Sequence, residues 1–177
     1  MDNVKHLVKK NNLHIILNYF CKMYMCEYLI FGDTDYNIFF TGSDIDICLF
    51  SDKPEFLCYQ LHSFFENSLN KKQFLFDLTI EQKRLKDTGY KLTVMYNNIK
   101  LSFCILDIIY KPFFDKLNNI QTLIIKQYYP IFMVIKFLYY KANILSLDTY
   151  KTIKKNIYNT SVYKYGIIYK FKTYKLL

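Results

Sequence analysis

The chain has 177 residues, of which 52% are hydrophobic and 19% are aromatic. This length and apolar content suit one packed domain, with at most part of a second. The first residues lack the apolar core of a secretory signal peptide, and no stretch is long and uncharged enough to span a bilayer. We therefore expect a protein that is not secreted and has no membrane partner.

The formal net charge of +9 is unevenly distributed along the chain. Residues 151–177 contain 7 Lys and no acidic residue, which leaves 17 basic and 15 acidic residues in the rest. Basic residues interleaved with Tyr fit a nucleic-acid strand through phosphate contacts and base stacking. A solvated tail accounts for the same composition, so both interpretations stay open.

The five cysteines are odd in number, and none has the Cys-x-x-Cys spacing of a zinc site or redox motif. Cys48 and Cys104 lie in apolar segments, where we expect them to pack as small hydrophobic residues. Free thiols of this kind suit a reducing compartment.

Hydrophobic periodicity predicts the elements in chain order. These are a helix over 4–25, strands over 28–31 and 44–50, a helix from 54 to 69, possible strands over 74–78 and 92–96, a strand over 99–110, and helices over 119–128 and 130–142 broken at Pro130. Asp52 suits the N-cap of the second helix and Glu55 a capping-box pattern. After Tyr150 the apolar periodicity fades. The order predicts an α+β fold, a mixed sheet with helices on one side.

Two carboxylates stand one residue apart in the predicted strand over 44–50. Because strand side chains alternate, Asp44 and Asp46 should share one face while Ile45 and Ile47 point into the core. Paired acids repel one another unless a divalent cation compensates their charge. Asp107 lies in a similar apolar setting, and three acids on adjacent strands would form a cage for Mg²⁺ or Mn²⁺ and a nucleoside triphosphate. A solvated strand end or a structural ion pair is the alternative.

Residues 31–46 resemble the signature of the DNA polymerase β-like nucleotidyltransferases: an apolar residue, Gly-Ser, a spacer, then Asp-x-Asp. Within that superfamily the segment is most similar to the nuclear noncanonical poly(A) polymerases of the TRAMP type. The resemblance implies a catalytic palm over 1–115, a partial helical central domain over 116–150 and a basic tail over 151–177. It makes Asp44, Asp46 and Asp107 the catalytic and metal-binding residues.

The resemblance also implies a nucleotide-binding set. Gly32, Asp33 and Ser43 fall at the phosphate-binding end of the signature. Val134 to Leu138 resembles a central-domain helix, which makes Lys136 the candidate triphosphate lysine, with Lys141 as an alternative. Thr149 and Tyr150 fall at a Ser-Tyr pair whose hydroxyl meets phosphate and whose ring stacks on the base. A solvent-facing helix lysine at 136 and a core aromatic at 150 are the alternatives.

The implied activity is template-independent addition of AMP from ATP to RNA 3′ ends by a two-metal mechanism. Partners by resemblance are a zinc-knuckle RNA-binding protein and a helicase, and the implied location is the nucleus, otherwise the cytoplasm. A terminal uridylyltransferase or a minimal polymerase of the same superfamily is one alternative. A catalytically inactive module that binds RNA or a partner is another, because the central domain is short here.

Asp33 stands where the family has Ser, and its carboxylate would repel a triphosphate unless a metal or a lysine compensates. The variant Asp33→Ser separates two possibilities in an RNA extension assay with ATP. Higher activity or a lower ATP requirement identifies Asp33 as a source of repulsion. Loss of activity identifies it as part of the metal site.

Overall fold

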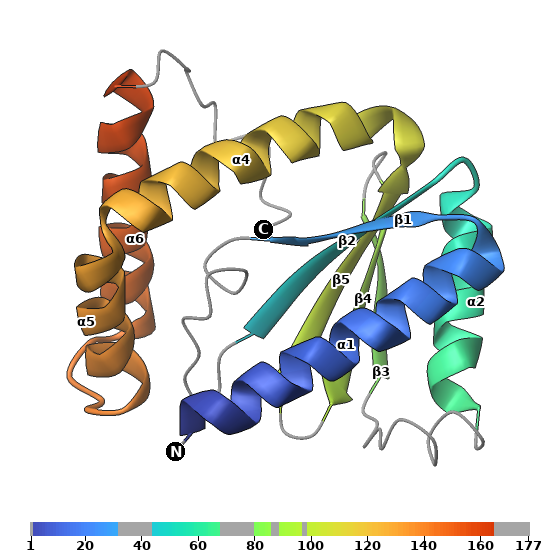
Figure 1. Ribbon diagram of the computed structural model, residues 1–177, viewed down its shortest axis with the longest axis horizontal. Helices are drawn as coiled ribbons and strands as arrows, with labels where there is room; N and C mark the ends of the chain where they lie inside the picture. Colours follow the sequence, from blue (N-terminus) through green and yellow to red (C-terminus); the bar gives the residue numbers. More distant parts are fainter. Residues whose placement is uncertain (1, 32–43, 68–79, 86–88, 97–98, 165–177) are drawn as a thin grey trace.

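A computed structural model describes residues 2–31, 44–67, 80–85, 89–96 and 99–164 (Figure 1). Its elements in chain order are α1 (Asp2–Tyr24), β1 (Glu27–Phe31), β2 (Asp44–Ser51), α2 (Pro54–Glu66), β3 (Ile80–Leu85), β4 (Gly89–Tyr96), β5 (Ile99–Asp107), a short 3₁₀ helix η2 (Ile108–Tyr110), α4 (Lys111–Gln127), α5 (Tyr129–Tyr140) and α6 (Leu147–Lys164). No helix among these residues is long and apolar enough to cross a membrane.

The five strands form one mixed sheet in the order β1-β2-β5-β4-β3. β2 and β5 are parallel, and every other neighbouring pair is antiparallel. The connection from β2 to β5 includes α2, as a parallel pair requires a crossover. The predicted α+β class with a mixed sheet is confirmed. The helices do not all lie on one side, because α1 and α2 pack on one face of the sheet and the first half of α4 packs on the other.

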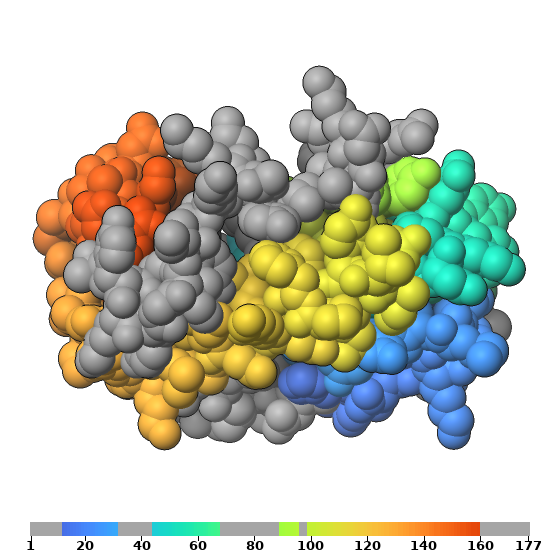
Figure 2. All heavy atoms as spheres, turned by 90° about the horizontal axis from the view of Figure 1, so that it is seen from above, coloured from blue at the N-terminus to red at the C-terminus, as the bar shows by residue number. Residues whose placement is uncertain are grey.

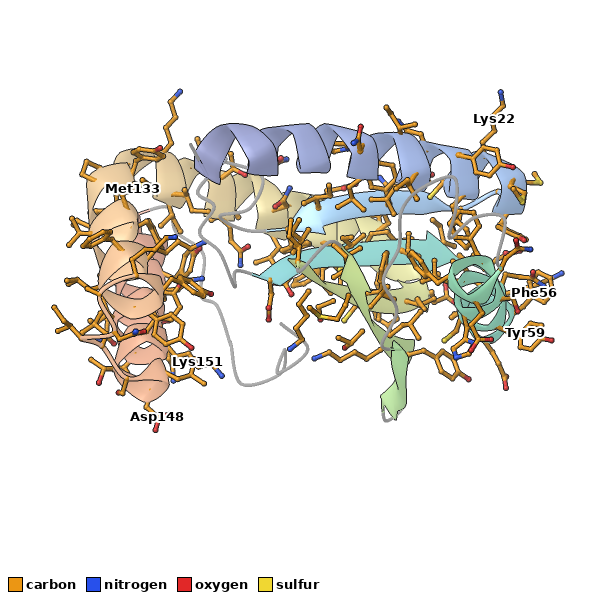
Figure 3. All side chains as sticks on the ribbon, turned by 90° about the horizontal axis from the view of Figure 1, so that it is seen from below. Lys22, Phe56, Tyr59, Met133, Asp148 and Lys151 are labelled. Atoms are coloured by element: carbon orange, nitrogen blue, oxygen red, sulfur yellow. The ribbon has the colours of Figure 1, made fainter. Side chains whose placement is uncertain are left out.

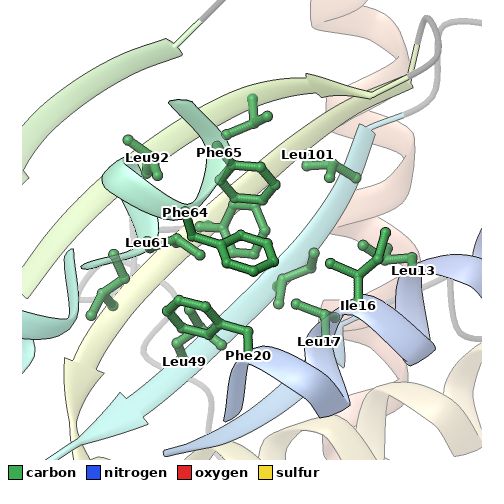
Figure 4. Packing of buried hydrophobic residues seen from close by; sticks show 14 of the residues in the cluster. Leu13, Ile16, Leu17, Phe20, Leu49, Leu61, Phe64, Phe65, Leu92 and Leu101 are labelled. Carbon is green, nitrogen blue, oxygen red and sulfur yellow. The ribbon is translucent and has the colours of Figure 1, made fainter. Parts of the chain in front are cut away.

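Alternation along β2 divides its side chains between two cores. Ile45, Ile47 and Leu49 are buried in the larger core, beneath α1 and α2. Figure 4 shows Phe20 of α1 and Phe64 of α2 meeting over this face of the sheet, with ring centroids 5.3 Å apart. Burying large side chains from both helices supplies much of the stability of such a domain.

The first half of α4 covers part of the opposite face of the sheet. Phe114 of α4 lies edge-on to Phe31 of β1 at a centroid distance of 5.6 Å and 5.8 Å from Phe50 of β2. Cys48 and Cys104 complete this second core. Lys111, at the start of α4, pairs with Asp115 at 2.7 Å and with Glu27 of β1 at 3.0 Å, and these contacts raise its pKa.

The second half of α4 packs with α5 and α6 in a third, helical core. Its buried members are Ile120, Ile124, Ile125, Phe132, Ile135, Tyr150 and Tyr158. Seen from above, α4 crosses the middle of the molecule from α2 toward α6 (Figure 2). One helix therefore contributes to both the sheet and the helical unit.

Several predicted boundaries need correction. α6 continues to Lys164, so helical packing extends past residue 150, where the sequence periodicity fades. α4 begins at Lys111 rather than at residue 119, and β5 ends at Asp107 rather than at residue 110. β3 was not predicted, because its sequence alternates weakly, and the possible strand over 74–78 lies outside the described residues.

The predicted start of α2 is correct, but its predicted cap is not. Pro54 lies in the first turn, as expected. Lys53 occupies the N-cap position, and no side chain caps the helix there. The hydroxyl of Ser51 instead accepts a hydrogen bond from the Lys53 N–H at 3.0 Å. The Ser51 hydroxyl also donates to an Asp52 carboxylate oxygen at 3.5 Å, so Asp52 takes part in the turn without capping the helix.

The contact between α4 and the sheet predicts that Phe114 contributes more to stability than its neighbour Phe113. Phe114 is 2% exposed and Phe113 is 41% exposed. We expect Phe114→Ala to lower the free energy of unfolding by about 3–5 kcal/mol because it leaves a cavity between α4 and two strands. Phe113→Ala should cost less than about 1–2 kcal/mol. Urea denaturation of both variants measures this, and equal losses would contradict the packing described.

Candidate active site

Asp44 and Asp46 lie at the start of strand β2, on one face of the sheet. The Asp44 side chain is 46% exposed and Asp46 is partly buried, while Ile45 and Ile47 between and after them are fully buried on the opposite face. This alternation confirms that the two carboxylates share a face. The acidic pair lies beyond the part of that face covered by Phe114, which packs on the second half of β2. In Figure 1 this beginning of β2 is the end nearer to α5 and α6.

The residues across from the acids lie on the parallel strand β5. Lys100 is the register partner of Asp44, and Ser102 is the partner of Asp46. The Lys100 ammonium is 3.6 Å from a carboxylate oxygen of Asp44, and both side chains are 46% exposed. Such a solvent-screened pair contributes little to stability. Thr93 of β4 continues the row beyond Ser102, and Glu81 of β3 is the register partner of Thr93. Two hydroxyl residues therefore separate Asp46 from the next acid in the row.

The structure does not bring Asp107 to the acidic pair, contrary to the expected three-acid cage. Asp107 pairs with Ser51, five residues after Asp46 along β2. At about 3.3 Å per residue, this places it about 16 Å along the sheet. Its carboxylate accepts a hydrogen bond from the Ile109 N–H at 3.0 Å and caps η2. The described geometry therefore gives Asp107 a helix-capping role.

Two thiols lie on the same face as the acids, further along both strands. Cys48 and Cys104 are register partners in the core beneath Phe114. Burial, with a contribution from Asp46, raises the pKa of Cys104 to about 11. Burial, followed by Cys104 and Asp46, raises the pKa of Cys48 well above its ordinary value. Both are neutral thiols near pH 7, and the thiolate is the metal-binding form, so they pack as predicted.

Lys136 and Tyr150 both lie in the helical unit. Lys136 is 3% exposed, and its ammonium is 6.0 Å from the centre of the Tyr140 ring. It is therefore not the solvent-facing lysine of the alternative interpretation. Tyr150 is 5% exposed and stacks on Tyr139, with centroids 4.7 Å apart and planes 9° apart. The Tyr150 face that would stack on a base is packed against another tyrosine, which makes it a core aromatic in this conformation.

Thr149 lies in the first turn of α6, beside a residue that the sequence pattern did not single out. The Ser146 hydroxyl donates to the Thr149 hydroxyl at 2.8 Å and accepts from the Thr149 N–H at 3.1 Å. Ser146 is therefore the N-cap of α6. Lys141 is exposed just after α5. Gly32, Asp33 and Ser43, the other predicted nucleotide-binding residues, lie outside the described residues.

The donor set fits one hard divalent cation. Mg²⁺ and Mn²⁺ prefer carboxylate oxygens, and Mg²⁺ is commonly held by one or two carboxylates together with substrate phosphates. Within the described part of the chain, no three or more His, Cys, Asp or Glu side chains gather where they could hold a metal. Asp44 and Asp46 can thus offer two carboxylates to a cation that arrives with a triphosphate.

Comparisons with known proteins find a structural likeness but no family. No protein-family model matches the chain, and no curated protein matches it. The chain is similar to a solved structure described as the polymerase core of TRAMP, an RNA surveillance complex, with 17% sequence identity and a TM-score of 0.42. The match covers 68% of this chain and 40% of that chain. The chain thus spans less than half of the polymerase-core chain it matches.

The position of Asp107 generates a prediction that separates capping from metal binding. Asp107→Ala removes the acceptor for the Ile109 N–H and should lower the free energy of unfolding by about 1 kcal/mol. Asp107→Asn keeps an acceptor and should cost less. Neither variant should change Mn²⁺ affinity measured by electron paramagnetic resonance. Weaker Mn²⁺ binding in both variants would instead indicate that Asp107 is a metal ligand.

Proposed function

We propose that this protein is a nucleotidyltransferase that adds AMP from ATP to RNA 3′ ends with Mg²⁺ or Mn²⁺. The observation that carries the proposal is the pair of carboxylates, Asp44 and Asp46, on the half of one face of β2 that Phe114 does not cover. The resemblance of residues 31–46, which include both acids, to the nucleotidyltransferase signature also supports it. A strand that carries an exposed and a partly buried acid side by side, next to a buried core, is suited to cation binding rather than to packing.

The reaction needs positioning and charge compensation more than covalent chemistry by the protein. The RNA 3′ oxygen bonds to the α-phosphorus, the bond to pyrophosphate breaks, and the hydroxyl proton passes to solvent. A divalent cation bound by the acids would supply Lewis-acid compensation of the phosphate charge. Asp44 and Asp46 would fix where the triphosphate lies. The Lys100 ammonium beside Asp44 adds a positive charge at the edge of this site.

RNA is the proposed acceptor because of the charge on α6. Lys151 and Lys155 are exposed, and the Lys154 ammonium is 5.4 Å from the Tyr150 ring centre. In Figure 3, Lys151 extends from α6 on the side of the helix that faces the sheet. Clustered lysines bind phosphates regardless of base sequence. A zinc-knuckle protein, a helicase and a nuclear location remain part of the proposal through the resemblance alone.

A second candidate is a module that binds nucleotide or RNA without transferring a nucleotide. The position of Asp107, about 16 Å from the acidic pair along the sheet, favours it. The burial of Tyr150 and Lys136 points the same way, because neither offers its ring face or ammonium to a nucleotide in this conformation.

The two candidates separate in an extension assay with labelled oligo(A), Mg²⁺ or Mn²⁺, and each nucleoside triphosphate in turn. We expect extension with ATP. Loss of a residue that merely supports a metal ligand costs about 10–100-fold in affinity, so Asp44→Ala and Asp46→Ala should lower the rate by at least about 100-fold. Asp52→Ala, which removes an exposed acid before α2, is the matched control and should leave the rate unchanged.

Other outcomes would identify the alternatives. Extension with UTP alone would indicate a terminal uridylyltransferase. No extension with any triphosphate, together with oligo(A) binding that survives Asp46→Ala, would contradict nucleotidyl transfer and support the binding module.

A further inference from the structure

The two positions on the parallel strand β5 that lie opposite the acids carry no carboxylate. Ser102 is opposite Asp46 and Lys100 is opposite Asp44. Residues opposite one another on neighbouring strands have their side chains on the same face, close enough to interact. The nearest place from which β5 could add a third carboxylate to the pair is therefore position 102, and a hydroxyl stands there.

This arrangement also fixes the net charge of the side chains at the site. Two carboxylates and the Lys100 ammonium, 3.6 Å from Asp44, carry one net negative charge. The triphosphate adds negative charge of its own, so the number of cations is limited by ligands rather than by charge. A second cation about 3.5–4 Å from the first needs protein oxygen ligands besides the two carboxylates that hold the first. No third metal-binding side chain joins the pair within the described residues. These donors fit one cation and do not fit the two that the family resemblance implies.

We infer that the site holds a single divalent cation, delivered with the triphosphate, and that Ser102 is the residue that keeps the second cation out. The inference rests on the proposed function in one respect, that Asp44 and Asp46 bind a metal–triphosphate. It goes further by assigning metal stoichiometry to one side chain on β5. Ser102 is partly exposed, so a somewhat larger polar side chain has access to solvent there.

The test counts Mn²⁺ ions by electron paramagnetic resonance in the full chain with α,β-methylene-ATP, which cannot be cleaved at the α-phosphate. The wild-type chain should bind one Mn²⁺. Ser102→Asp should bind two. Its affinity for the second ion should be higher than that of the wild-type chain by about tenfold or more. Ser102→Asn matches the aspartate in size without its charge and should still bind one. Circular dichroism confirms that each variant is folded before it is titrated.

The outcomes distinguish this inference from the proposed function. Two Mn²⁺ ions in the wild-type chain would overturn the inference and leave the proposed function in place. A single ion in folded Ser102→Asp would overturn the role of Ser102. No Mn²⁺ binding in the presence of the ATP analogue would overturn both. The wild-type count decides the stoichiometry even if Ser102→Asp does not fold.

Discussion

The parallel pairing of β2 with β5 is the constraint on which the rest of the site depends. One register sets three things at once: Ile45 and Ile47 enter the large core, Cys48 meets Cys104 beneath α4, and Ser102 meets Asp46. The register cannot slip by one residue without exposing that core, because every side chain of β2 would change faces. The polar neighbours of the acids are thus held in place by apolar packing further along the same strands.

α4 divides the face of the sheet that carries the acids. Phe114 closes the half over Cys48 and Phe50, and the paired contacts of Lys111 hold the start of the helix against β1 and its own next turn. The acids lie on the half beyond Phe114. Since the second half of α4 belongs to the core with Phe132 and Tyr158, the same helix also sets where the helical unit stands relative to β2 (Figure 1).

Local pattern was enough to predict much of the fold but only part of the site. Alternation identified β2 and the shared face of Asp44 and Asp46, because a strand's period is a property of its own residues. Asp107 has the same apolar setting as the acids, yet setting does not specify register, and register depends on residues far apart in sequence. Position 102 gave no signal, because a serine within a strand is ordinary until its neighbour across the sheet is known.

In the helical unit, too, local sequence pattern did not determine which side chains are buried. The sequence left open whether Tyr150 is a core aromatic, and stacking on Tyr139 places it there in this conformation. Burial of Lys136 against Tyr140 matches neither a triphosphate ligand nor a solvent-facing lysine. A lysine that is this well packed loses rotamer freedom and hydration, and the Tyr140 ring is one neighbour that offsets this loss.

The balance of charge around β2 follows from these placements. The register neighbours of Asp44 and Asp46 supply an ammonium at Lys100 and hydroxyls at Ser102 and Thr93. The exposed lysines of α6 lie on a separate element that α4 ties to the sheet. The proposed phosphate-rich ligand agrees with this arrangement, because lysine ammoniums attract phosphate and a cation held by the two acids would attract it as well. The register between β2 and β5 then sets which side chains of β5 lie beside the acids.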